Sequence, residues 1–213
     1  MELSPHDLIK IKNYGNLNID FSTHAWALEA LKKSPFVVVR RALILDKLIP
    51  IGIRGNLRSQ RLAAFLPFSD IDNIFKPTYI VEKKLWLQNS HIKNTNIFSS
   101  IEIISKIFEE YNLKWGICGS TGFELVTKMP TITENSDLDI MIKIETADEL
   151  FSAALAKELC EKLFNINVRT DIQIETSKGA IALTEYANET NPILIRTISG
   201  PRLINRENLG VIL

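Results

Sequence analysis

Hydrophobic and polar positions alternate most regularly in the second half of the chain, from Ser99 onward. Apolar residues at helical spacing predict helices at residues 99–112, 122–128, 147–164 and 180–187. Short apolar runs and period-two alternation predict strands at residues 114–118, 136–144, 168–175 and 193–198. Helices and strands that follow one another in this way are typical of a layered α/β or α+β domain.

The first half of the chain has a less regular pattern. It predicts a helix at residues 23–33, a strand at 36–45, a return strand at 48–54 and a helix at 58–65 that Pro67 ends. Asparagines break up residues 88–98, which we interpret as a linker. We therefore expect an α+β protein with a smaller N-terminal α+β domain at residues 1–88 and a second domain with a mixed sheet at residues 99–213.

The composition is ordinary for a soluble globular enzyme. Of its 213 residues, 46% are hydrophobic and 23% are charged, which is enough to bury a core. No apolar run approaches the roughly 20 residues of a membrane span, and the N-terminus lacks the pattern of a signal peptide. Cys118 and Cys160 form no CxxC pair, so we interpret them as thiols in a reducing cytoplasm.

The net charge is zero, but the charges are unevenly distributed. Residues 1–98 carry 14 basic and 8 acidic side chains, a net charge of +6, whereas residues 99–213 carry 11 and 17, a net charge of −6. The zero total argues against a polybasic nucleic-acid binder. The asymmetry predicts two regions with different charged partners.

Two aspartates stand out on the predicted strand at residues 136–144. Side chains alternate along a strand, so the isoleucines and leucine at positions 138, 140, 142 and 144 share a core face. Asp137 and Asp139 share the opposite face, about 7 Å apart along the strand. Two carboxylates there would repel unless a cation lies between them, and all-oxygen ligands suit Mg²⁺.

The next predicted strand repeats this arrangement. Val168, Ile172 and Ile174 lie on its apolar face, and Asp171 and Glu175 lie on its polar face. If the two strands are neighbours, either Asp171 or Glu175 can join the aspartate pair. The alternative is that these polar side chains simply face water.

A glycine-containing turn precedes the aspartates, with Ser120 lying 17 positions before Asp137. Glycine lets a backbone approach phosphate closely, and a helix that starts there offers free N–H groups. We assign Gly119 and Ser120 to phosphate binding. A local alternative covers only Thr121 and Glu124, which match a capping box.

Three arginines, Arg54, Arg58 and Arg61, follow one another closely in the basic half. Arginine suits bidentate phosphate recognition, so we interpret them as a polyanion clamp, with a solvated surface as the alternative. Residues 69–72 repeat the Ser-Asp-x-Asp pattern, but no Gly-Ser turn precedes them, and we expect a helix start there instead. The three histidines have no partners at ligand spacing, and we assign none of them to catalysis.

The order Gly-Ser, short helix, Asp-x-Asp strand and later carboxylate resembles the nucleotidyltransferase superfamily. Gly119, Ser120, Asp137 and Asp139 match its pattern, and Asp171 sits where its third carboxylate is expected. The connection at residues 127–135 is longer than in many members.

A narrower resemblance runs from residue 5 to residue 203. Eight segments in one order resemble the phosphoribosyl-dephospho-CoA transferases of malonate decarboxylase: PHDL (5–8), FVVVRR (36–41), IPIGIRG (49–55), RSQR (58–61), GSTGFEL (119–125), SDLDI (136–140), DIQIET (171–176) and GPRL (200–203). This resemblance implies a nucleotidyltransferase-like domain at residues 99–213. It also implies a basic domain at residues 1–88 that faces the substrate and a carrier protein.

The activity that the resemblance implies is transfer of a prosthetic group. The donor would be 2′-(5″-triphosphoribosyl)-3′-dephospho-CoA, the acceptor a serine of the acyl carrier protein subunit of malonate decarboxylase, and the leaving group diphosphate. Asp137, Asp139 and Asp171 would hold Mg²⁺, with Asp171 as a ligand or as the acceptor of the serine proton. We expect neither a membrane nor a nucleic-acid partner. The alternatives are a nucleotidyltransferase with another substrate, whether a small molecule, RNA or protein, and a non-enzymatic nucleotide-binding module.

Overall fold

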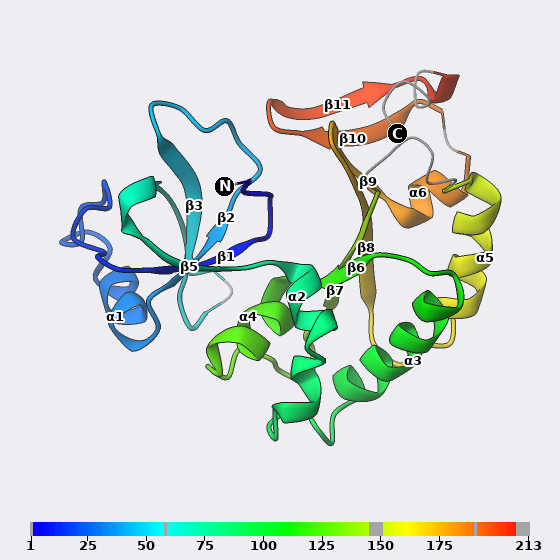
Figure 1. Ribbon diagram of the computed structural model, residues 1–213, viewed down its shortest axis with the longest axis horizontal. Helices are drawn as coiled ribbons and strands as arrows, with labels where there is room; N and C mark the ends of the chain where they lie inside the picture. The colour runs from blue at the N-terminus through cyan, green and yellow to red at the C-terminus, as the bar shows by residue number, and fades with distance from the viewer. Residues whose placement is uncertain (1, 58, 145–150, 190, 208–213) are drawn as a thin grey trace.

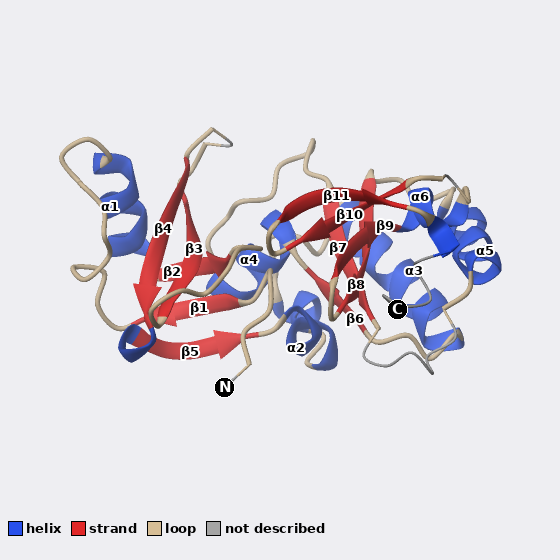
Figure 2. Ribbon diagram, turned by 90° about the horizontal axis from the view of Figure 1, so that it is seen from above, coloured by secondary structure: helices blue, strands red, loops and turns tan. Residues whose placement is uncertain are grey.

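Two β-sheets with separate hydrophobic cores organise the described part of the chain (Figures 1 and 2). The structure is a computed structural model, and it describes residues 2–57, 59–144, 151–189 and 191–207. We call the first sheet with its core the first lobe, and the second sheet with its core the second lobe. The expected α+β class is confirmed.

The first lobe is an antiparallel five-stranded sheet with a helix on one face. Its strands occur in the order β4-β3-β2-β1-β5. They are β1 (Leu8–Ile11), β2 (Phe36–Val39), β3 (Leu48–Arg54), β4 (Arg61–Pro67) and β5 (Ile71–Phe75). Helix α1 (Ala25–Lys33) buries Ala27 and Leu31 in this core, because these positions fall on one face of the helix.

The second lobe contains a mixed six-stranded sheet, as expected. Its order is β11-β10-β9-β8-β7-β6, and β7 and β8 run parallel while the other neighbours are antiparallel. The strands are β6 (Trp115–Ile117), β7 (Leu138–Lys143), β8 (Thr170–Thr176), β9 (Gly179–Ala182), β10 (Ile193–Thr197) and β11 (Gly200–Ile204). The helices are α2 (Pro77–Glu82), α3 (Asn96–Glu110), α4 (Gly119–Thr127), α5 (Ala153–Leu163) and α6 (Leu183–Ala187).

The helices of the second lobe lie on both sides of its sheet. Figure 1 shows α3 and α5 on the side away from the first lobe, whereas α2 and α4 lie between the two sheets. The apolar face of β7 supplies Leu138, Ile140 and Ile142 to the core with α3 and α5, and all three are buried. The opposite face of β7, which carries Asp139, therefore turns toward the first lobe.

The segment at residues 61–67 is a strand, and the helix expected at 58–65 is wrong. Strand β4 pairs with β3 along its whole length, from Arg54 opposite Arg61 to Leu48 opposite Pro67. Its burial alternates, since Ala64 and Leu66 are buried and Ala63 and Phe65 are exposed. The neighbouring strand decides the conformation, because a run of apolar residues fits either period.

Three other expectations need correction. Residues 180–182 belong to β9, so only 183–187 of the expected 180–187 helix is helical. Residues 68–70 form a short 3-10 turn that leads into β5, so the helix expected to start at Ser69 is wrong. Strand β2 ends at Val39 rather than at Leu45, and β1, β5 and β11 are strands that the pattern did not predict. The other expected elements are confirmed within a few residues. Of the helix expected at 147–164, residues 147–150 lie outside the described residues, and α5 begins at Ala153.

The limits of the two domains, 1–88 and 99–213, stay a prediction. Ile80, Trp86 and Ile92 are buried in the core of the second lobe, so the segment between β5 and α3 contacts that lobe. Pro77 and Thr78 of α2 lie so close to Gly116 of β6 that a side chain there would meet them within 2.5 to 2.8 Å.

Candidate active site

Asp139 and Asp171 are neighbours across the parallel pair of strands β7 and β8. They are direct register partners, as are Leu138 with Thr170 and Ile140 with Ile172. Register partners in a sheet point to the same face, so both carboxylates lie on the face turned toward the first lobe. The condition set by the sequence, that the two acidic strands be neighbours in the sheet, is therefore met.

The start of helix α4 lies directly beside Asp139. The Cys118 N–H donates to the Asp139 carbonyl oxygen at 2.8 Å, which fixes the turn against the strand. Gly119 has a φ of +60°, and a Cβ atom there would lie 1.7 Å from Asp139 Oδ2. Only glycine combines this backbone conformation with this close approach.

These residues enclose a small cavity, which we call the carboxylate pocket. It has a volume of about 200 Å³ and is lined by His6, Arg61, Cys118, Gly119, Asp139, Ile140, Met141, Asp171 and Gln173. Asp137 precedes β7 and Ser120 follows Gly119 in α4, and neither lines the pocket as the structure describes it. The structure thus brings together Asp139, Asp171, Gly119 and Arg61 from the predicted site.

Burial and neighbouring negative charges both act on Asp139 in the carboxylate pocket. Burial raises the pKa of Asp139, and the charges of Asp171 and Asp137 raise it further, while His6 and Arg61 lower it. Within the described ranges, no three His, Cys, Asp or Glu side chains converge closely enough to hold a metal ion as they stand. The donor chemistry nevertheless fits Mg²⁺, because clustered carboxylate oxygens are its preferred protein ligands.

Glu175, the alternative third carboxylate, is held by two basic side chains. It forms an ion pair with the Arg41 guanidinium, and its carboxylate lies 3.3 Å from His6 Nε2. Burial alone would raise the pKa of Glu175, but the hydrogen bonds and charges of His6 and Arg41 leave it below its ordinary value. Glu175 does not line the carboxylate pocket, so Asp171 is the acidic side chain of β8 nearest to Asp139.

His6 belongs to the site, although it was not assigned from the sequence. It lines the carboxylate pocket and contacts Glu175, and its φ of +74° is uncommon for a residue other than glycine. Such backbone conformations concentrate at functional sites. His6 lies in the PHDL segment (5–8), which contributes to the family resemblance. The positions of His6 and Glu175 along the chain gave no sign that the two side chains are in contact.

Glu124 anchors the long connection between α4 and β7, and the capping-box interpretation is wrong. Its buried carboxylate accepts from the N–H groups of Thr131 at 2.7 Å and Ile132 at 2.9 Å and contacts His91 Nδ1 at 2.6 Å. Thr121 lies inside α4, where its hydroxyl is buried with no hydrogen-bond partner among the described residues. Glu124 therefore fixes the loop that leads to Asp137.

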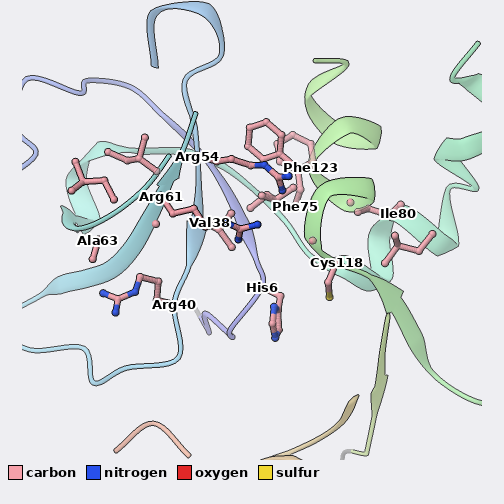
Figure 3. A pocket seen from close by; sticks show the side chains of 17 residues that line it. His6, Val38, Arg40, Arg54, Arg61, Ala63, Phe75, Ile80, Cys118 and Phe123 are labelled. Carbon is pink, nitrogen blue, oxygen red and sulfur yellow. The ribbon is translucent and has the colours of Figure 1, made fainter. Parts of the chain in front are cut away.

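Arg54 and Arg61 meet through strand pairing rather than helical spacing. They are register partners on β3 and β4, and both line a cleft of about 380 Å³ between the lobes, which we call the interlobe cleft (Figure 3). The pairing places two positively charged members of the predicted clamp side by side at the cleft, and their role as a clamp stays a prediction. Arg58 lies outside the described residues.

The buried carboxyl group of Asp7 makes the stability of the protein depend on pH. Burial raises its pKa from 3.8 to about 6, partly offset by the Ser4 N–H, which donates to Asp7 Oδ2 at 2.9 Å, and by the charge of Lys76. Folding therefore favours the protonated acid. Below pH 4 Asp7 is protonated in both the folded and the unfolded chain, and it does not reduce stability. As the pH rises from 4 to 6 the free energy of unfolding falls, and above pH 6 it is lower by about 3 kcal/mol.

We expect Asp7→Asn to stabilise the protein more at pH 7 than at pH 5, by about 1 kcal/mol, because asparagine keeps the hydrogen bond without the charge. Urea unfolding at both pH values measures this difference. Asp72→Asn is the control, since Asp72 is a half-exposed partner of Lys10 at 3.0 Å. Equal stabilisation of the Asp7 variant at both pH values would contradict the assignment.

Comparison with known proteins identifies the family. The model of the phosphoribosyl-dephospho-CoA transferase MdcG N-terminal domain matches residues 4–77, and that of the MdcG C-terminal domain matches residues 84–207. The chain belongs to this family. The two matches correspond closely to the two lobes. Because the members of this family are transferases, the chain is a transferase.

Curated phosphoribosyl-dephospho-CoA transferases are similar along nearly the whole chain. The protein from Pseudomonas syringae pv. tomato is 29% identical over 94% of this chain and 91% of its own length. The Pseudomonas putida protein is 30% identical over 94% and 93%, and the Klebsiella pneumoniae protein is 29% identical over 93% of each. No solved structure matches the chain. None of the helices among the described residues combines the length and apolar character of a transmembrane span.

Proposed function

We propose that this transferase loads the prosthetic group of malonate decarboxylase. It would transfer 2′-(5″-phosphoribosyl)-3′-dephospho-CoA from its triphosphoribosyl precursor to a serine of the acyl carrier protein. The observation that carries the proposal is the family match over both lobes, together with the pairing of Asp139 and Asp171 beside the start of α4. The unpaired thiols of Cys118 and Cys160 support a cytoplasmic location as part of the proposal.

The residues of the site can bind the triphosphate in a defined orientation. The first turn of α4, with Gly119 and Ser120, presents backbone N–H groups at the positive end of the helix dipole. Arg61 lines both the carboxylate pocket and the interlobe cleft, so its guanidinium can contact a phosphate that lies between them. The serine oxygen then bonds to the phosphorus nearest the ribose, and the bond to the departing diphosphate breaks.

Asp137, Asp139 and Asp171 would hold Mg²⁺ in this proposal. The raised pKa of Asp139 supports it, because a bound cation would remove the repulsion among these carboxylates. When bound, Mg²⁺ would neutralise charge on the triphosphate and on the leaving diphosphate. Asp171, the exposed member of the Asp139–Asp171 pair, can also accept the proton that the serine hydroxyl loses.

Intact-protein mass spectrometry tests the proposal. The full chain is incubated with Mg²⁺, the triphosphoribosyl donor and the acyl carrier protein, and we expect the carrier mass to increase by one phosphoribosyl-dephospho-CoA group. A carrier protein with its acceptor serine changed to alanine is the matched control, and we expect no adduct on it. A known family member run in parallel establishes the conditions. An unmodified wild-type carrier under those conditions would refute the proposed acceptor.

Removal of divalent cations with EDTA tests the metal separately. We expect adduct formation to stop and to return when excess Mg²⁺ is added. Transfer that continues at full rate in EDTA would refute the metal while leaving the acceptor assignment intact.

A further inference from the structure

The interlobe cleft adjoins the carboxylate pocket but has a different chemical character. Its walls are largely apolar, with Leu8, Val38 and Phe75 from the first lobe and Ile80, Ile117 and Phe123 from the second. Its volume of about 380 Å³ falls in the range of small-molecule sites. Phosphate groups would make no favourable contacts with these apolar side chains, so the cleft suits an uncharged part of a ligand.

A flat cationic group and an aromatic ring face each other across this cleft. The guanidinium carbon of Arg54, at the end of β3, lies 6.0 Å from the ring centroid of Phe123 in α4. Figure 3 shows the Arg54 side chain extending from the first lobe toward Phe123, with Phe75 beside them. Aromatic rings and guanidinium planes are the surfaces on which proteins stack nucleobases.

One ligand can occupy the cleft and the carboxylate pocket together. His6, Arg61, Cys118 and Gly119 line both cavities, so the two are continuous. A molecule whose triphosphate lies beside Asp139 can therefore place its next portion along Arg61 and Gly119. From there the cleft leads to Arg54 and Phe123.

We propose that the interlobe cleft binds the adenosine part of the donor, with the purine ring against Phe123 and the Arg54 guanidinium. This inference rests on the proposed function, because it concerns the same donor. The triphosphate-bearing ribose is joined directly to the adenosine ribose, so adenosine is the portion nearest the reacting phosphorus. The pantetheine arm begins only beyond a further diphosphate, and it has no flat face to stack against Phe123 and Arg54.

Calorimetric titration of the full chain with ADP tests this assignment without metal or acceptor. Phe123→Leu keeps an apolar side chain but removes the ring, and Arg54→Lys keeps the charge but removes the plane. We expect each to weaken ADP binding by about tenfold, the effect of losing one base-stacking contact. Phe65→Leu is the matched control, since Phe65 is an exposed β4 residue outside the cleft. It should leave ADP affinity unchanged.

A competition arm separates the nucleoside from the pantetheine. We expect 4′-phosphopantetheine not to displace ADP. Displacement of ADP by 4′-phosphopantetheine, absence of ADP binding to the wild type, or wild-type ADP affinity in both the Phe123 and the Arg54 variant would overturn the proposal. If circular dichroism shows that Phe123→Leu does not fold, Arg54→Lys decides the outcome, because Arg54 lies at a half-buried strand end.

Steady-state transfer separates this inference from the proposed function. We expect Arg54→Lys to raise the KM for the donor by about tenfold with kcat retained, which a loss of folding would not produce. Transfer by the wild type with an unchanged KM in this variant refutes the cleft assignment alone. ADP binding that depends on Phe123 and Arg54 in a protein that transfers nothing refutes the proposed function alone.

Discussion

Replacing Asp139 by asparagine should lower the rate of transfer by about a thousandfold, equivalent to about 4 kcal/mol of transition-state stabilisation. Asp139 is the carboxylate at the centre of the site, since it faces Asp171 across the strands and Gly119 across the turn. Asparagine has nearly the same shape but no charge, so it removes the proposed Mg²⁺ ligand without opening a cavity. Diphosphate release measures the loss.

The same variant should be more stable than the wild type at pH 8. Burial and the charges of Asp171 and Asp137 raise the pKa of Asp139, so ionised Asp139 destabilises the fold at this pH. A gain in stability together with a loss of activity is typical of a charged functional group whose burial destabilises the fold. Urea unfolding measures the stability.

Asp72→Asn is the matched control for Asp139→Asn. Asp72 occupies the corresponding position in the similar segment Ser69-Asp70-Ile71-Asp72, but there it pairs with Lys10 on the first lobe. We expect wild-type turnover and a stability change of no more than about 0.5 kcal/mol. Asp139→Asn with turnover close to that of the Asp72 variant would remove Asp139 from the chemistry.

The acidic strands could be predicted because their pattern is local. Leu138, Ile140 and Ile142 occupy every second position, and this two-residue period indicates a β-strand with one buried face. The pairing of Asp139 with Asp171 required only that β7 and β8 be neighbours. The predicted pair therefore depended on one tertiary fact, which the structure supplies.

The missed features depend on contacts between distant segments. Residues 62–66 are all apolar, so their own pattern cannot distinguish a strand from a helix, and pairing with β3 decides it. His6 lies 169 positions before Glu175, and only the packing of the lobes brings them together. Arg54 and Arg61 likewise adjoin through antiparallel register, which no helical spacing describes.

Replacing Gly119 by alanine should lower turnover by about a hundredfold and stability by about 1 to 2 kcal/mol. The stability cost arises because a φ of +60° is unfavourable for a residue with a Cβ atom. The loss of turnover has a separate cause, since the new methyl group would lie 1.7 Å from Asp139 Oδ2 and must displace that carboxylate. Urea unfolding and diphosphate release measure the two effects independently.

Gly200→Ala separates the backbone cost from the collision with Asp139. Gly200 also has a positive φ, +107°, but a Cβ atom there would meet nothing within 4 Å. We expect a loss of stability of the same order as in Gly119→Ala, with turnover retained. If Gly119→Ala transferred the group as fast as Gly200→Ala, the contact between Gly119 and Asp139 would have no part in positioning the carboxylate. A hundredfold difference between two variants of similar stability would instead assign the loss to Asp139, because the backbone cost is common to both.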